Sequence, residues 1–421
     1  MTDSSASTVE IAKGNTLSTG GSSPKAFKDG YFDYNFARFL GLCPYSGAEI
    51  GECFATAHRI IDGDVESWVR EWTATAQRVE ALAEDSFKRG HKFSAREAWL
   101  RATTYYQAAF FFVLDGDPRK PELYQKHTGC FQKAAPLFNP PIEPLAIPYR
   151  DDRDGNKEKS LFGYFVRPDP RDFPGPRPTV LIQMGADGSS EQIYFSGGGA
   201  AAARRGYNAI IFEGPGQTGT FMRDRTLTYR FDWEKPVAAV VDFALTRSEL
   251  VDPQRIALIA YSMGGYLGPR AAAFEKRLAA TIVSGLVPEI KGLAKGFEDA
   301  EAARAAGKPP NHSHRWLLNE HMPKWGLNGG FDDVPKLREM SGNCVLYGLE
   351  DKITCPLLVV QAAAEGDETT NRAKAFFDKL PNPKNKFRLT TVEDGADMHC
   401  QKGNASLLHA IEFDWLEEVM G

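Results

Sequence analysis

A serine between small residues is the best candidate nucleophile in the chain. Residues 255–261 form an apolar run typical of a buried strand, and Ser262 follows it directly, ahead of a glycine-rich helix start. A hydroxyl on a sharp strand-to-helix turn is exposed for attack, and such a turn closes only if the residues two before and two after it are small. Ala260 and Gly264 occupy those positions. The pattern therefore predicts a nucleophilic serine.

A serine hydroxyl is inert without a base, and in this arrangement the base is a histidine late in the chain. Of the eight histidines, only His399 follows the last predicted strand, in a glycine-containing loop. The other seven fall in a helical region, in a long insertion or in the last helix: His58, His91, His127, His312, His314, His321 and His409. We therefore expect His399 to be the general base.

The acid that orients the histidine should follow the preceding strand, which is predicted over 357–361. Three carboxylates lie just beyond it, at Glu365, Asp367 and Glu368. Asp367 is the predicted triad acid and Glu365 is its competitor, while Glu368 is expected to be a solvated charge. The acid fixes the imidazole tautomer and stabilises its cation.

Backbone amides should hold the oxyanion. The amide of Met263 lies at a helix start, where N–H dipoles favour negative charge, and a second donor is expected at Ala186, ahead of Gly185, in the loop after the third strand. Asp187 has two interpretations, a loop-capping turn or a contact with substrate that could assist proton transfer. Gly185, Asp187 and Tyr261 are the predicted substrate-binding residues.

A second glycine-rich loop covers 213–219, with the sequence Glu-Gly-Pro-Gly-Gln-Thr-Gly. It matches neither phosphate-binding glycine pattern and no lysine follows it. We expect a tight structural turn beneath the active site.

Composition narrows the class of protein. The chain has 421 residues with 50 basic and 55 acidic side chains, a net charge of −5, which argues against nucleic-acid partners and anionic membrane surfaces. No run of about 18 apolar residues is present, so no membrane span is expected. The first residues do not resemble a secretory signal, and the six scattered cysteines show no metal-ligand spacing. We expect a cytoplasmic protein without metal or cofactor.

The first third of the chain is predicted to be helical. Residues 1–24 are rich in Ser, Thr and Gly and are expected to be flexible, and 25–140 should form a helical cap domain. Apolar residues over 65–87 repeat with helical spacing, and the Ser94–Glu97 pair has the form of a capping box at a helix start. The aromatic-rich segment 27–42 could be a dimer arm or could dock on its own subunit. A homodimer is predicted.

From residue 141 onward, strands alternate with helices, which is typical of a doubly wound, mostly parallel sheet. The expected strands are 145–149, 161–167, 179–184, 209–213, 255–261, 280–284, 357–361 and 387–392. About 60 residues, at 286–345, lie between two core strands and are expected to form a helical lid.

These motifs together resemble the α/β-hydrolase superfamily. Within it the chain is similar to a branch with a helical N-terminal domain that includes 2,6-dihydroxypseudooxynicotine hydrolase, the fermentation-respiration switch protein and fungal yellowish-green polyketide-shortening hydrolases. The matching segments are 94–98, 185–191, 213–217, 260–265, 353–359 with 365–367, and 399–400. The resemblance implies an eight-stranded α/β-hydrolase sheet and triad roles for Ser262, Asp367 and His399. Three alanines at 362–364 lengthen the acid loop relative to that branch, which keeps Glu365 open.

The resemblance also implies hydrolysis of a carbon–carbon bond beside a ketone, or of an ester. We expect a serine hydrolase without cofactor, acting on a small carbonyl substrate of aromatic or polyketide-like character. The aromatic side chains of the cap that suggest such a ligand could equally be ordinary core. The alternatives are a carboxylesterase or lactonase, an acyltransferase with the same triad, and a non-catalytic ligand-binding protein on the same scaffold.

Overall fold

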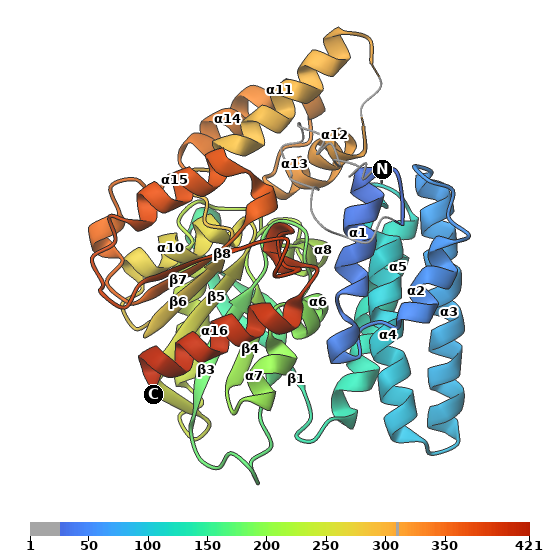
Figure 1. The fold of residues 1–421 in the computed structure, drawn as a ribbon, viewed down its shortest axis with the longest axis horizontal. Coiled ribbons are helices and arrows are strands. Elements are labelled where there is room, and N and C mark those ends of the chain that lie inside the picture. Colours follow the sequence, from blue (N-terminus) through green and yellow to red (C-terminus); the bar gives the residue numbers. More distant parts are fainter. Residues whose placement is uncertain (1–25, 309–310) are drawn as a thin grey trace, which may run out of the picture.

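The computed structural model describes residues 26–308 and 311–421. The predicted flexible segment 1–24 lies outside the described residues. A group of long helices stands beside an α/β body, and helices of a later segment lie above that body (Figure 1). The chain changes from helix to strand between Leu137, where the last short turn of the helical part ends, and Glu143, where the first strand begins.

The helical part packs as antiparallel neighbours. Its helices are α1 Gly30–Leu40, α2 Ile50–Ala57, α3 Val65–Lys88, α4 Lys92–Phe111 and α5 Arg119–Ala134. The predicted apolar stripe lies on α3, where Trp68 and Trp72 are fully buried. The predicted capping box is wrong, because α4 already begins at Lys92 and Ser94 lies inside its first turn.

The aromatic segment at 27–42 docks on its own subunit. Phe32, Phe36 and Phe39 on α1 are completely buried in the same apolar cluster as the two tryptophans of α3. Phe32 packs edge-on against Trp68, with ring centroids 4.7 Å apart. Of the two interpretations of this segment, the structure favours docking within the chain.

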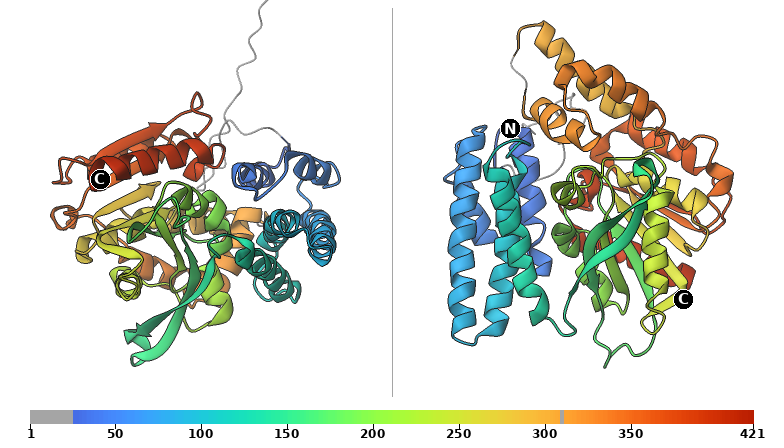
Figure 2. Two further views of the ribbon diagram at one scale, coloured as in Figure 1. Left: turned by 90° about the horizontal axis from the view of Figure 1, so that it is seen from below. Right: turned by 180° about the vertical axis from the view of Figure 1, so that it is seen from behind.

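The body is an eight-stranded sheet in the order β1-β2-β4-β3-β5-β6-β7-β8. The strands are β1 Glu143–Asp151, β2 Lys157–Val166, β3 Arg177–Gln183, β4 Asn208–Glu213, β5 Val251–Tyr261, β6 Ala280–Ser284, β7 Leu357–Ala362 and β8 Lys386–Thr390. β2 pairs antiparallel with β1 and β4, and the remaining neighbours are parallel. The β1–β2 ribbon extends from one edge of the body (Figure 2). The predicted α/β fold class is confirmed.

Helices cover both faces of this sheet and complete two apolar layers. One layer joins the cap to the helices α6 Ser190–Ser196, α7 Gly199–Arg204 and α16 Ala405–Met420. The other is formed by α9 Glu234–Leu245, α10 Gly264–Phe274 and α15 Asp367–Phe377, together with the segment between β6 and β7. A short helix, α8 Thr218–Arg223, follows β4.

The segment between β6 and β7 is helical, with α11 Lys291–Ala305, α12 His312–Trp316, α13 Met322–Lys324 and α14 Val334–Gly342. It lies above the carboxyl ends of the parallel strands (Figure 1). In an open parallel sheet that edge is where ligands bind. No helix within residues 26–308 or 311–421 is long and apolar enough to cross a membrane.

Candidate active site

Ser262 lies on a strained turn between β5 and α10. Its φ of 61° is left-handed, a conformation that non-glycine residues rarely adopt and that marks a functional turn when the surroundings enforce it. A Cβ on Gly264 would lie 2.9 Å from the Cβ of Ala260, and a Cβ on Gly265 would overlap the carbonyl oxygen of Gly285. Only small residues on both sides let this turn close, as the sequence pattern predicted.

His399 meets Ser262 across the carboxyl edge of the sheet. Its Nε2 lies 2.9 Å from the Ser262 Oγ. The loop that carries the imidazole is anchored by Gln401, whose amide oxygen accepts from the Ser284 hydroxyl at 2.7 Å and whose amide nitrogen donates to Thr390 at 3.1 Å. The polar side chain of Gln401 therefore fixes the loop to the ends of β6 and β8.

The carboxylate on the histidine is Glu365, which corrects the expectation of Asp367. The Glu365 Oε1 lies 2.6 Å from the His399 Nδ1. A short 3-10 turn at Ala363–Glu365 extends β7 and directs Glu365 toward the sheet edge. Gly366, with φ of 88°, then reverses the chain, so that Asp367 is exposed as the first residue of α15.

The electrostatics of His399 favour its cation. Burial alone lowers the pKa of the imidazole, but the adjacent Cys400 sulfur and the Glu365 carboxylate raise it, and the result lies well above the usual value. A histidine that is readily protonated after taking the serine proton can return that proton to a leaving group. The arrangement can therefore act as base and then as acid.

The loop after β3 lies against the nucleophile turn. A Cβ on Gly185 would be 2.5 Å from the backbone nitrogen of Met263, so only glycine permits this approach. The carbonyl of Gly185 accepts hydrogen bonds from Gln217 at 3.1 Å and Tyr229 at 3.2 Å. Gln217 also donates to the Met184 carbonyl. The 213–219 loop is thus the predicted structural turn, and it fixes the backbone next to Ala186, one of the two predicted oxyanion donors.

Asp187 and the carbonyl of Ala186 are held from outside the sheet. Arg38 on α1 donates from Nη1 to the Asp187 Oδ2 at 2.9 Å, and Lys324 on α13 donates to the Ala186 carbonyl at 3.0 Å. Both basic side chains are almost fully buried. Helices from the cap and from the segment between β6 and β7 therefore meet at the loop beside Ser262.

Tyr261 does not line the site, and its prediction as a substrate-binding residue is wrong. It is fully buried on β5, and its hydroxyl donates to the Glu412 Oε1 on α16 at 2.8 Å. The side chain of the residue before the nucleophile points into the core because successive strand residues alternate between faces. Burial raises the pKa of Glu412 to about 8, so this carboxyl is held mostly neutral at pH 7.

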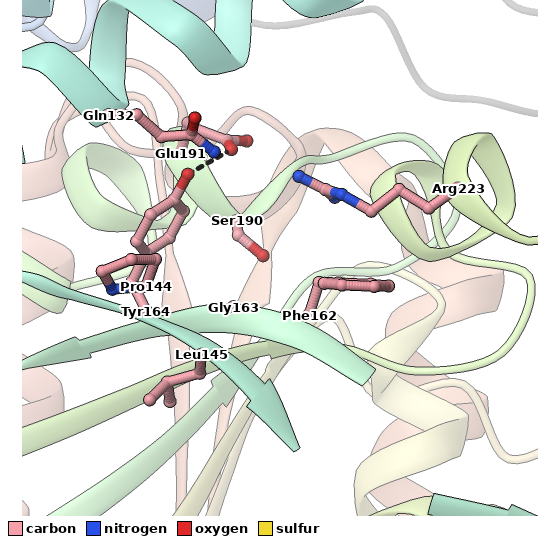
Figure 3. Close-up of a pocket in the computed structure, with 9 residues that line it drawn as sticks. All are labelled: Gln132, Pro144, Leu145, Phe162, Gly163, Tyr164, Ser190, Glu191 and Arg223. Atoms are coloured by element: carbon pink, nitrogen blue, oxygen red, sulfur yellow. Dashed lines mark hydrogen bonds between the residues drawn. The ribbon is translucent and has the colours of Figure 1, made fainter. Parts of the chain in front are cut away.

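A separate cavity of about 190 Å³ lies between β1, β2, α6 and α8 (Figure 3). Glu191 points into this region and accepts from the Tyr164 hydroxyl at 2.8 Å, while its other oxygen lies 3.2 Å from the His127 Nε2 on α5. None of the lining residues belongs to the cluster around Ser262. The buried Glu191 carboxylate thus joins α6 to the cap. The cavity is separate from the candidate active site at Ser262.

Several positioning residues were missed at the sequence level. Four of them contact the site from positions far away in the sequence, where no local pattern could reveal the contact: Arg38, Gln217, Lys324 and Gln401. Gln361 could have been predicted to lie near the site, because it is the one polar residue of the apolar strand β7 and stands near its carboxyl end. Its amide donates to the Glu365 carboxylate. Within the described ranges, no three His, Cys, Asp or Glu side chains gather to hold a metal ion.

The chain is similar to known proteins over most of its length. Residues 185–401 match the model of the alpha/beta hydrolase family. The chain is 31% identical to 20-hydroxy-prefusarin hydrolase FUS2 of Gibberella moniliformis, over 94% of this chain and 98% of that protein. It is 37% identical to hydrolase ORFZ of Pyricularia oryzae, with the same coverage of both chains.

A solved structure shares the fold over most of this chain. The crystal structure of 2,6-dihydroxy-pseudo-oxynicotine hydrolase matches with a TM-score of 0.68 and 24% identity, over 90% of this chain and 95% of that one. The match covers the cap as well as the sheet, so the helical N-terminal part is a feature of both folds.

Proposed function

The chain belongs to the alpha/beta hydrolase family and is a hydrolase, and from this premise we propose that it is a serine hydrolase with a Ser262–His399–Glu365 triad. The single observation that carries the proposal is the unbroken hydrogen-bonded series from the Ser262 Oγ through His399 to Glu365, at 2.9 and 2.6 Å. Glu365 takes the place that the sequence resemblance gave to Asp367.

In the proposed reaction, the Ser262 Oγ attacks a substrate carbonyl carbon while His399 Nε2 takes the hydroxyl proton. The amides of Met263 and Ala186 are the proposed hydrogen-bond donors to the oxyanion, where negative charge develops. When the tetrahedral intermediate collapses, the bond to the leaving carbon breaks, the electron pair departs with that carbon as an enolate, and the imidazolium protonates it. Water, activated by the same imidazole, then releases the acyl group as a carboxylic acid.

We infer that the substrate is a ketone, with the bond beside the carbonyl as the one that breaks. The inference is supported by the relatives named above, one of which is called a hydrolase of 20-hydroxy-prefusarin. Ester or lactone hydrolysis needs the same residues and differs only in the leaving atom, which is oxygen instead of carbon.

A fluorophosphonate probe tests the nucleophile. We expect wild-type protein to be labelled once per chain and Ser262→Ala to be unlabelled, with both proteins folded by circular dichroism. Product analysis on paired substrates, an aryl 1,3-diketone and the ester in which oxygen replaces the central carbon, then separates the two reactions. A folded wild-type chain that neither takes the probe nor turns over either substrate contradicts the proposal and favours a ligand-binding role.

The wider organisation belongs to the same proposal. A cap domain at 25–140 and a hydrolase domain at 141–421 are supported by the change from helix to strand between Leu137 and Glu143. The homodimer and the cytoplasmic location stay predictions from the sequence. Light scattering of the purified chain and microscopy of a fluorescent fusion test them.

A further inference from the structure

One face of the cap helix α1 is directed at the catalytic loop. Tyr31, Tyr34 and Arg38 have the spacing i, i+3 and i+7, which places them on one stripe of a helix. Arg38 reaches Asp187, so this stripe faces the loop beside Ser262. In Figure 1, α1 is the cap helix that lies next to the α/β body.

Tyr31 and Tyr34 carry phenol hydroxyls on that stripe. Both side chains are half-buried, and neither phenol oxygen makes a hydrogen bond to any residue in 26–308 or 311–421. The buried cap tyrosine Tyr106 differs in this respect, because its hydroxyl donates to Glu80 at 2.7 Å. Burial, with the nearby Asp187 carboxylate, raises the pKa of Tyr31 above its usual value, so its hydroxyl stays a proton donor.

Asp187 offers an open acceptor beside them. Arg38 occupies its Oδ2, and no donor in the described ranges reaches its Oδ1. The side chain keeps 28% of its surface exposed. Burial alone would raise the pKa of Asp187, but Arg38 lowers it below the usual value, so the carboxylate is ionised.

We propose that Asp187, Tyr31 and Tyr34 form a subsite for an oxygenated ketone, in which a hydroxyl of the substrate donates to the Asp187 Oδ1 and the two phenols donate to further substrate oxygens. The inference rests on the proposed function, because it places the scissile carbonyl at the Ala186 amide. Ala186 and Asp187 are adjacent, and neighbouring Cα atoms are about 3.8 Å apart. The recognised hydroxyl therefore lies a few bonds from the carbonyl, as in an enol or an ortho-hydroxyaryl ketone.

The test measures binding to Ser262→Ala protein by calorimetry, with 1-(2-hydroxyphenyl)butane-1,3-dione and its 2-methoxy ether as probes. We expect the hydroxyl compound to bind about tenfold more tightly, the worth of one hydrogen bond to a charged acceptor. Asp187→Asn should reduce this preference to below about threefold, because a neutral acceptor binds the hydroxyl less strongly. Tyr31→Phe and Tyr34→Phe should each weaken both probes by about threefold or more. Tyr347→Phe, which removes an exposed hydroxyl, is the matched control.

Three results would each overturn the subsite. The two probes bind equally well to the Ser262→Ala protein, the preference for the hydroxyl probe survives in folded Asp187→Asn, or both tyrosine variants bind the probes as tightly as before. The tyrosine variants keep the test valid if Asp187→Asn does not fold. Fluorophosphonate labelling of the variants with Ser262 intact separates this outcome from failure of the triad: a subsite that is absent leaves labelling intact, whereas a failed triad leaves wild type unlabelled whatever the probes do.

Discussion

Replacing Glu365 by Gln changes which nitrogen of His399 carries the proton, and the structure says in which direction. The Leu286 amide donates to the Gln361 Oε1 at 3.0 Å, so the Gln361 amide nitrogen must face residue 365. An amide at 365 then turns its oxygen toward Gln361 and its NH₂ toward His399. The imidazole must accept that hydrogen at Nδ1 and carry its own proton on Nε2, where it can no longer take the proton of Ser262.

The loss can be estimated from this wrong tautomer. A triad with an amide in place of the acid loses about 10⁴ in kcat, or about 5 kcal/mol of transition-state stabilisation. We expect Glu365→Gln to lose between about 10³ and 10⁴ in kcat/KM on any substrate that wild type turns over. Asp367→Asn is the matched control, because Asp367 is exposed on α15, and it should retain wild-type activity within about twofold.

The pH profile gives a second readout. His399 must be neutral to act as base, and its pKa is raised, so the acid limb of kcat/KM for wild type should lie above pH 6.5, the usual value for histidine. Removing the Glu365 charge should move the residual acid limb of Glu365→Gln to lower pH. The assignment is wrong if Asp367→Asn loses as much activity as Glu365→Gln, or if Glu365→Gln stays within about tenfold of wild type while remaining folded.

Three further variants probe the surroundings of the site. Gly185→Ala places a Cβ 2.5 Å from the Met263 nitrogen, so a loss of about 10² to 10³ in kcat is expected in steady-state assays, and unchanged kcat would contradict the close approach. Gln217→Ala leaves the carbonyl of Gly185 without one of its donors, and we expect a loss of about 1–3 kcal/mol in urea unfolding together with lower kcat. Glu412 has a raised pKa of about 8, so the stability it contributes is full below its unfolded pKa near 4.5 and is lost as pH rises toward 8. Glu412→Gln, which can still accept from Tyr261, should therefore gain stability relative to wild type between pH 5 and pH 8, on the order of 3 kcal/mol by urea unfolding, and a gain independent of pH would refute this.

The sequence was most informative where function depends on local backbone shape. Strands and tight turns depend on residues that are neighbours in the sequence. The apolar runs therefore predicted the eight strands, and the small residues around Ser262 predicted its turn. His399 was identified because parallel strands bring their carboxyl ends to one edge. Both inferences needed no knowledge of side-chain directions.

Knowledge of side-chain directions was needed to identify the carboxylate that contacts His399. Glu365 and Asp367 are two residues apart in one loop, and the choice between them depends on a single 3-10 turn and on the reversal at Gly366. The prediction for Tyr261 was wrong for a related reason: the alternation of strand residues directs its side chain away from the site, although its neighbour Ser262 is the proposed nucleophile. The contact between Arg38 and Asp187 joins residues 149 positions apart, and a single sequence holds no signal for it.

The loop after β3, which carries the proposed oxyanion donor Ala186, is held by side chains from the body, the cap and the segment above the sheet. Gln217 and Tyr229 fix the carbonyl of Gly185 from within the body, Lys324 fixes that of Ala186 from the segment above the sheet, and the cap holds Asp187 through Arg38. Donors that are fixed before the reaction need no reorganisation when charge develops, which is the source of their catalytic effect. The cap is therefore more than a cover for the substrate: a cap displaced from the body would release the Asp187 side of this loop, so turnover should depend on the same docking of α1 that shapes the binding site.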